Sequence, residues 1–239
     1  MSEFVEPYGP WGVVAGASEG LGEAFARGCA RRGLNVVLVA RRRDVVEKLA
    51  DAISRENGVE ARAITADLSV RAELDRVLEE TSELDVGLLV YNAAYSLIGP
   101  FWKSSIDDHL KEIDVNVRGP LVLARGFGER MRARGRGGIV LLSSMAGFQG
   151  SALISNYAAT KAYNLVLGEG LWDELRTDGV DALVCCAGAT RTPNYERSEP
   201  AGGESGLVPV QTPEAVAEEA PEYLGRGPLL IPGRTNGLG

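Results

Sequence analysis

The chain has 239 residues, and its 33 acidic and 25 basic side chains give a formal net charge of −8. That length fits one large domain or two small ones. The acidic balance argues against a protein that binds nucleic acid or an anionic membrane surface. The chain contains a single histidine, which excludes any metal site that needs two or more histidines.

The cysteines, the N-terminus and the hydropathy pattern together predict a soluble cytoplasmic protein. The three cysteines cannot all pair and none has CxxC spacing, which favours buried thiols in a reducing compartment. The opening MSEFVEPYGPW is acidic and lacks the basic-then-apolar order of a signal peptide. No uninterrupted apolar stretch reaches the length of about 18 residues that a membrane span needs.

Short continuous apolar runs alternate with helical patterns along the whole chain. The runs predict strands that are buried on both faces, at residues 11–15, 35–40, 59–65, 86–91, 138–142, 180–187 and 228–231. Between them, helical periodicity predicts helices at residues 21–32, 43–57, 70–81, 106–117, 120–134, 155–177 and 213–224. This alternation indicates a single-domain α/β fold, a doubly wound seven-stranded parallel sheet with helices on both faces.

Two segments interrupt this regular order. Residues 193–212 contain three prolines and three glycines and read as irregular chain. An irregular segment of that length in a compact domain predicts a substrate lid. Pro221 lies inside the last helical pattern, so that helix is expected to be shorter than its pattern or to bend there.

A glycine-rich turn follows the first predicted strand. Glycines at this position let the backbone approach a pyrophosphate closely, and the following helix N-terminus supplies free N–H groups. The spacing is GxxxGxG, and its place after the first strand of an alternating chain favours nucleotide binding over a simple tight turn. The candidate contacts are Gly16, Ser18, Glu19, Gly20, Leu21 and Gly22.

The same turn also spells GxSxG, the nucleophile motif of serine hydrolases. That interpretation needs Ser18 as the nucleophile and a histidine late in the chain. The only histidine, His109, lies in a polar helical segment well before the last strands. The hydrolase hypothesis is therefore the weaker one.

Three arginines follow the second predicted strand. An acid at this place would bind the ribose 2′-hydroxyl of NAD, but no acid appears before Asp44. An arginine there would instead pair with the 2′-phosphate of NADP through charge-assisted hydrogen bonds. We therefore expect NADP(H) to be preferred over NAD(H), with Arg41 as the first candidate for the phosphate and Arg42 as the second.

A set of polar residues in the second half of the chain carries the predicted chemistry. Tyr157 and Lys161 are four residues apart and lie on one face of a predicted helix. A tyrosine has a pKa of about 10, and a neighbouring lysine cation lowers that pKa. The pair therefore suits proton transfer to or from an alcohol oxygen. Ser144 could hold the same oxygen, and Asn116 could order water behind Lys161.

The glycine turn, Asn116, Ser144, Tyr157 and Lys161 occur in an order that resembles the short-chain dehydrogenase/reductase family. The resemblance covers roughly residues 11–233 and implies one NAD(P)-binding Rossmann domain over residues 1–239. It implies catalysis by Ser144, Tyr157 and Lys161 with Asn116 assisting. It also implies further cofactor contacts, with Lys161 on the ribose, at Asp67, Leu68, Asn92, Ala93, Ala94, Tyr157, Lys161, Gly188, Thr190 and Thr192.

Two positions depart from the family pattern. Where the family has a threonine before the first glycine this chain has Ala15, and where the family has Asn-Asn-Ala-Gly it has Tyr91-Asn-Ala-Ala94. In the family these two places touch. Losing both partners of a hydrogen bond can be nearly neutral. We therefore expect a repacked cofactor floor, with cofactor affinity more affected than the fold.

The substrate pocket is expected at the carboxyl ends of the strands, beside the predicted lid. Its candidate residues are mainly apolar, with Gln149 as a possible polar contact; they are Tyr95, Phe148, Gln149 and Ile154. This composition favours a hydrophobic small-molecule ketone or secondary alcohol. The branches that this chain resembles reduce ketosteroids and long-chain 3-oxoacyl thioesters with NADPH.

The sequence therefore predicts an NADP(H)-dependent oxidoreductase that transfers a hydride between nicotinamide and a carbonyl carbon, with reduction as the favoured direction. The alternative is a nucleotide-binding regulatory or non-catalytic member of the same fold. The resemblance also implies a homodimer or homotetramer that associates through the helices near residues 120–134 and 155–177.

Overall fold

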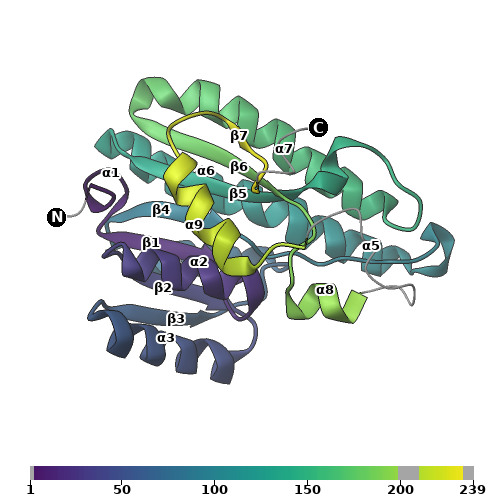
Figure 1. Ribbon diagram of the computed structural model, residues 1–239, viewed down its shortest axis with the longest axis horizontal. Coiled ribbons are helices and arrows are strands. Elements are labelled where there is room, and N and C mark those ends of the chain that lie inside the picture. Colours follow the sequence, from purple (N-terminus) through teal and green to yellow (C-terminus); the bar gives the residue numbers. More distant parts are fainter. Residues whose placement is uncertain (1–2, 199–209, 234–239) are drawn as a thin grey trace.

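The computed structural model describes residues 3–198 and 210–233. They form one seven-stranded parallel sheet in the order β3-β2-β1-β4-β5-β6-β7 (Figure 1). The strands are β1 Trp11–Ala15, β2 Asn35–Ala40, β3 Ala61–Thr65, β4 Val86–Tyr91, β5 Gly137–Ser144, β6 Val180–Ala187 and β7 Leu229–Leu230. The doubly wound seven-stranded sheet predicted from the sequence is confirmed, with β3 and β7 shorter than their apolar runs and β5 longer.

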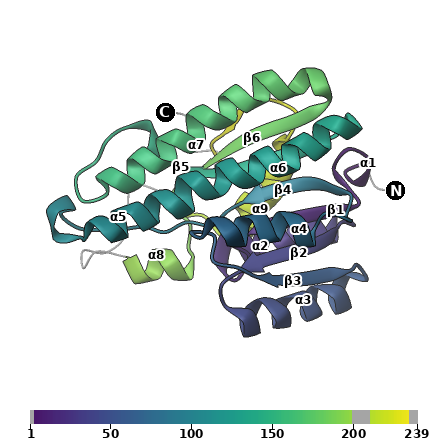
Figure 2. The same ribbon diagram turned by 180° about the vertical axis from the view of Figure 1, so that it is seen from behind.

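Helices cover both faces of this sheet. One face carries α2 (Gly20–Arg31), α3 (Arg43–Asn57) and α9 (Pro213–Tyr223), which lie in front in Figure 1. The other face carries α4 (Arg71–Glu80), α6 (Gly119–Arg134) and α7 (Ser155–Leu175), which lie in front in Figure 2. Short 3-10 turns lie at Phe101–Lys103 (η1), Met145–Phe148 (η3) and Arg176–Asp178 (η4).

The core lies in two layers because successive strand residues point to opposite faces. In β1, Val14 packs into the layer under α2, α3 and α9, whereas Val13 and Ala15 pack into the layer under α4 and α6. All five residues of β1 are buried. A strand covered on both faces has no position for an exposed polar side chain, which is why its sequence is a continuous apolar run.

Two helical features are not apparent in the sequence pattern. A short N-terminal helix, α1, spans Val5–Tyr8. The helix predicted at residues 106–117 is divided into α5 (Ile106–Ile113) and a π-helical turn, η2 (Asp114–Arg118), which leads directly into α6. Pro120 lies in the first turn of α6, where its missing N–H costs no hydrogen bond of that helix.

The two irregular segments of the sequence have different outcomes. Residues 193–198 form helix α8 (Pro193–Ser198), so the expectation of irregular chain is wrong there; proline is well tolerated in the first turn of a helix. Residues 199–209, which would make up most of the predicted lid, lie outside the described residues. Pro221 lies in the last turn of α9, which ends at Tyr223, one residue before the end of its pattern.

Between residues 3–198 and 210–233, no helix combines the length and the apolar character that crossing a membrane requires.

Candidate active site

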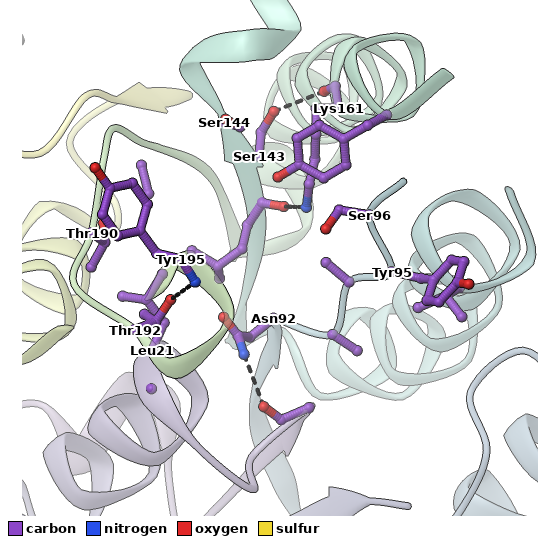
Figure 3. Close-up of a pocket in the computed structure, with 18 of the residues that line it drawn as sticks. Leu21, Asn92, Tyr95, Ser96, Ser143, Ser144, Lys161, Thr190, Thr192 and Tyr195 are labelled. Carbon is purple, nitrogen blue, oxygen red and sulfur yellow. Dashed lines mark hydrogen bonds between the residues drawn. The ribbon is translucent and has the colours of Figure 1, made fainter. Parts of the chain in front are cut away.

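A cavity of about 740 Å³ lies at the carboxyl ends of the parallel strands. The segments that follow β1, β2, β3, β4, β5 and β6 all contribute to its lining. Figure 3 shows Ser143, Ser144 and Lys161 on one side of it and Thr192 and Tyr195 across from them. The sheet order reverses between β1 and β4, and ligands of open α/β sheets bind at such a point.

The glycine turn between β1 and α2 is packed too tightly for side chains. A Cβ on Gly16 would lie 2.5 Å from the backbone of Ala93, and one on Gly22 would lie 1.9 Å from the carbonyl oxygen of Gly16. Gly16 and Gly20 have φ values of +85° and +58°. No side chain caps the N-terminus of α2. The turn therefore presents backbone N–H groups to the cavity, as a pyrophosphate site requires.

Backbone and amide groups tie this turn to β4. The side-chain Nδ2 of Asn92 donates to the carbonyl of Gly16 at 2.8 Å. The backbone N–H groups of Asn92 and Ala93 both donate to the carbonyl of Ala15 at 2.9 Å. The turn and β4 are thus joined without a hydroxyl at position 15. Ala94 follows this contact, is exposed and lines the cavity.

Tyr91 occupies buried space beneath the same strand end. Its hydroxyl donates to the carbonyl of Val115 at 2.6 Å. A Cβ on Gly119 would lie 2.0 Å from that hydroxyl. Tyr91 therefore supports the π-helical turn η2, so the altered residue has a packing role on the side of β4 that faces α6.

One arginine and one aspartate line the end of the cavity near β2 and β3. Arg41 is exposed and lines the cavity, and so does Asp67 at the end of β3. Burial alone would raise the pKa of Asp67, but hydrogen bonds from Ser69 and the charge of Arg41 outweigh it and lower that pKa. Arg42 instead turns to the glycine turn, where it pairs with Glu19 at 2.6 Å and reaches the hydroxyl of Ser18 at 3.2 Å. Arg41 is thus the better placed of the two for a phosphate inside the cavity.

Three polar side chains meet at the opposite end of the cavity. Ser144 ends β5, whereas Tyr157 and Lys161 lie one turn apart on α7, and all three line the cavity. The Nζ of Lys161 donates to the carbonyl of Leu142 at 2.9 Å and lies 5.6 Å from the centre of the Tyr157 ring. The Ser143 hydroxyl donates to the carbonyl of Lys161 at 2.8 Å, which fixes α7 against β5.

Burial and neighbouring groups shift the pKa values of Lys161 and Tyr157. Burial lowers the pKa of Lys161 to about 8, so the ammonium and the free amine are both accessible near neutral pH. Burial raises the pKa of Tyr157, and the hydrogen bond from Ser144 opposes that change. A buried phenol beside a cation and a hydroxyl donor can give a proton to a bound oxygen and be re-protonated.

Asn116 lies on η2, is fully buried and does not line the cavity. Its Oδ1 accepts from the backbone N–H of Tyr95 at 2.8 Å, and its Nδ2 donates to the carbonyl of the same residue at 2.8 Å. The Nδ2 also donates to the Thr160 hydroxyl at 3.0 Å. The side chain therefore braces the segment after β4 against α7. The ordering of water behind Lys161 stays a prediction.

The predicted substrate residues divide into two groups. Tyr95 and Ile154 line the cavity, with the Tyr95 ring turned toward α5, where Lys111 lies 5.5 Å from its centre. Phe148 and Gln149 lie outside the lining and are exposed, so the structure gives no support to their predicted contact with substrate. They sit at the end of η3, whose turn carries them past the cavity.

The structure brings most of the predicted cofactor residues together in this one lining. Those present are Gly16, Ser18, Glu19, Gly20, Leu21, Arg41, Asp67, Leu68, Asn92, Ala93, Ala94, Gly188, Thr190 and Thr192. Gly22 and Arg42 are not part of it, since Gly22 is buried within α2 and Arg42 pairs with Glu19. Sequence reasoning did not single out Ser96, Ile98 and Met145, which also line the cavity; their position just after β4 and β5 was the available signal.

Two other site types find no support in the described chain. The residues at 3–198 and 210–233 contain no group of three histidine, cysteine or acidic side chains that could hold a metal. His109, the single histidine, is buried on α5 and pairs through Nε2 with the carbonyl of Phe101 at 3.0 Å. It does not line the cavity that contains Ser18, so the serine hydrolase hypothesis lacks its base.

Known proteins resemble this chain in both sequence and fold. The family model for short chain dehydrogenase matches residues 11–201. The chain belongs to the short-chain dehydrogenase family. It is therefore an oxidoreductase that acts on CH–OH groups with a nicotinamide cofactor, and the expected resemblance is confirmed.

Several members of the short-chain dehydrogenase family resemble this chain over nearly its whole length. The 7beta-hydroxysteroid dehydrogenase of Clostridium sardiniense is 34% identical over 233 residues, which are 98% of this chain and 89% of that protein. A structure solved to explain 7beta-hydroxysteroid dehydrogenase stereoselectivity matches with a TM-score of 0.92 at 34% identity, covering 99% of this chain and 92% of that one. A short-chain dehydrogenase from Sphingobium yanoikuyae in complex with NADPH matches with a TM-score of 0.84 at 32% identity, covering 93% and 87%.

Proposed function

We propose that this protein is an NADPH-dependent reductase of bulky, apolar ketones, with a steroid-like ketone as the substrate class. The observation that carries the proposal is the meeting of Ser144, Tyr157 and Lys161 in the cavity that the glycine turn also lines. The relatives named as 7beta-hydroxysteroid dehydrogenases support a polycyclic substrate. The bulky apolar side chains of the lining, Ile98, Met145 and Ile154, support the same class.

Residues of this chain fit a nicotinamide dinucleotide along the cavity. The uncapped N-terminus of α2 would hold the pyrophosphate, and the glycines leave the room that close approach requires. Arg41 would pair with the 2′-phosphate of NADP(H), since no acidic side chain precedes Asp44 after β2. Asp67 and Leu68 would lie against the adenine. The NADPH complex of the Sphingobium yanoikuyae relative supports this preference.

The geometry supports a distinct role for each of three residues in the proposed reaction. When bound, NADPH supplies the hydride that reduces the carbonyl carbon of the substrate. Tyr157 gives its phenolic proton to the carbonyl oxygen, so that a secondary alcohol forms. Ser144 donates a hydrogen bond to the same oxygen and stabilises the negative charge that develops there. Lys161, held by the Leu142 carbonyl, stabilises the phenolate that remains on Tyr157.

The exposed apolar residues of the helices support association into a homodimer or larger assembly. Leu121 on α6 is 44% exposed and Val166 on α7 is 67% exposed. Both lie on the helices that the family resemblance assigned to subunit contact.

The activity is tested by incubating the purified protein with NADPH and a panel of ketones that range from acetone to polycyclic keto-steroids. We expect NADPH consumption that depends on the ketone, with the lowest KM values among the bulky apolar members. The outcome that would contradict the proposal is NADPH binding without consumption for every ketone. That result would favour the non-catalytic, nucleotide-binding alternative.

A further inference from the structure

A buried carboxylate lies behind the proposed catalytic residues. Glu112 on α5 is fully buried and does not line the cavity. Burying a carboxylate is unfavourable unless hydrogen bonds replace its water. Both oxygens have such a partner: Oε1 accepts from the backbone N–H of Leu97 at 2.9 Å, and Oε2 accepts from the Nδ2 of Asn156 at 2.6 Å. Each carboxylate oxygen of Glu112 is thus held by one specific donor.

The two donors come from different segments, each adjacent in sequence to residues that line the cavity. Leu97 lies between Ser96 and Ile98, which both line the cavity on its substrate side. Asn156 directly precedes Tyr157 at the start of α7, and its Nδ2 also reaches the carbonyl of His109 at 3.2 Å. One carboxylate therefore joins the segment after β4 to the helix that carries the proposed acid.

A second brace lies on the other side of Tyr157. Asn116 holds Tyr95 through two hydrogen bonds of 2.8 Å and bonds to Thr160. Asn156 and Thr160 thus bracket Tyr157 on α7, and each is tied to the same substrate-side segment. The brace through Glu112 holds Leu97, which lies within the substrate wall at Ser96–Ile98. Glu112 is the only ionisable side chain that makes a hydrogen bond in either brace.

The charges around Glu112 come from two helices. His109 lies on its own helix, Tyr157 and Lys161 lie on α7, and the segment at residues 93–100 contributes Tyr95 as its single titratable side chain. Burial raises the pKa of Glu112, while the bonds from Leu97 and Asn156 oppose that change. A negative charge on Glu112 adds to the rise that burial causes in the pKa of Tyr157, and it offsets part of the lowering that burial causes in the pKa of Lys161.

Building on the proposed reductase function, we propose that Glu112 is a positioning residue that fixes the substrate wall at Ser96–Ile98 relative to Tyr157. Reaction requires the carbonyl oxygen to lie within hydrogen-bond reach of the phenol. The wall contacts the ketone and so determines its position in the cavity. Glu112 fixes the position of the wall through its hydrogen bond with Leu97. A negative charge on Glu112 also favours the protonated forms of Tyr157 and Lys161, whose pKa values burial shifts first.

The test is the Glu112→Gln variant, which keeps the shape of the side chain and removes its charge. We expect the KM for the ketone to rise roughly tenfold, the size expected for losing charge-assisted hydrogen bonds, while the Kd for NADPH stays unchanged. Both apparent pKa values of the pH–rate profile should move to lower pH, since removal of a negative charge weakens proton binding at both groups. A purely structural role would not produce that shift.

Two further variants complete the experiment. Asn156→Ala should reproduce the rise in KM but not the shift of both pKa values, because the charge of Glu112 remains. Glu129→Gln, an exposed acid on α6 that pairs with Arg125, should change neither quantity. If Glu112→Gln does not fold, the KM of Asn156→Ala still tests the proposal.

The outcomes separate this inference from the proposed function. If the unsubstituted protein fails to consume NADPH with every ketone of the panel, the reductase assignment fails and the inference falls with it. If the protein is active but the folded Glu112→Gln variant keeps the same KM and the same pH profile, the inference alone is overturned. A wild-type KM in Asn156→Ala would also contradict it.

Discussion

Replacing Tyr157 with phenylalanine is expected to lower kcat for ketone reduction by about 10³-fold, within the range that general acid catalysis supplies. The phenol lines the cavity and bonds to Ser144, and the Nζ of Lys161 lies 5.6 Å from the centre of its ring. The ring remains in the variant, so packing of α7 and the Kd for NADPH should change little. Steady-state kinetics and a fluorescence titration of NADPH measure the two effects.

Tyr163→Phe is the matched control for this change. Tyr163 lies on the same helix, is also partly buried and does not line the cavity. Its variant should keep wild-type kcat. Substantial turnover by Tyr157→Phe with an identified ketone would show that another group transfers the proton, and the assignment of the site would then be wrong.

Replacing Arg41 with alanine is expected to remove most of the preference for NADPH over NADH. Charge-assisted hydrogen bonds contribute about 1.5–3 kcal/mol, which corresponds to roughly 10- to 100-fold in Kd. Arg41 is exposed, and solvent screening reduces such interactions, so we expect a rise of about tenfold in the Kd for NADPH. The Kd for NADH should stay constant, and isothermal titration with each cofactor measures both.

Arg43→Ala controls for the loss of positive charge from the arginine run. Arg43 is exposed and pairs with Glu47 one turn along α3 at 2.8 Å, outside the cavity lining. The same charge is lost in this variant, yet the cofactor preference should remain. Equal affinities of the unsubstituted protein for NADPH and NADH would refute the role of Arg41.

The sheet could be predicted closely because its strands are buried on both faces. Such strands are unbroken apolar runs, and β1, β2, β4 and β6 begin and end where their runs do. The predictions were less accurate where tertiary contacts determine the boundary. β7 pairs with β6 through only Leu229 and Leu230, so half of its apolar run at residues 228–231 lies outside the sheet.

The π-helical turn at Asp114–Arg118 could not be predicted, because its cause lies elsewhere in the chain. The apolar periodicity continues through this segment and favours an uninterrupted helix. The Tyr91 hydroxyl bonds to Val115, and the Asn116 amide pairs with the backbone of Tyr95. These are contacts between residues 21 and 24 positions apart, and helical periodicity carries no information on them.

Part of the proposed site could also be predicted from the sequence, because some of its residues lie at spacings set by local structure. Ser144, Tyr157 and Lys161 follow a spacing that the helix α7 and the end of β5 impose, so their meeting was predicted. Glu112 carries no such signal, since an acid in a polar helical segment normally faces solvent. Only the positions of Leu97 and Asn156 reveal that it is buried and bonded on both oxygens.

The central claim is that a hydride passes from NADPH to a carbonyl carbon held beside Tyr157. It is tested most directly with NADPH that carries deuterium at C4 of the nicotinamide ring, prepared in both stereochemical forms, and a ketone that the protein reduces. Mass spectrometry of the product should show one deuterium on the carbinol carbon with one of the two forms, and none with Tyr157→Phe in the same time. An alcohol without deuterium from either form, or no alcohol from any ketone, would contradict the account.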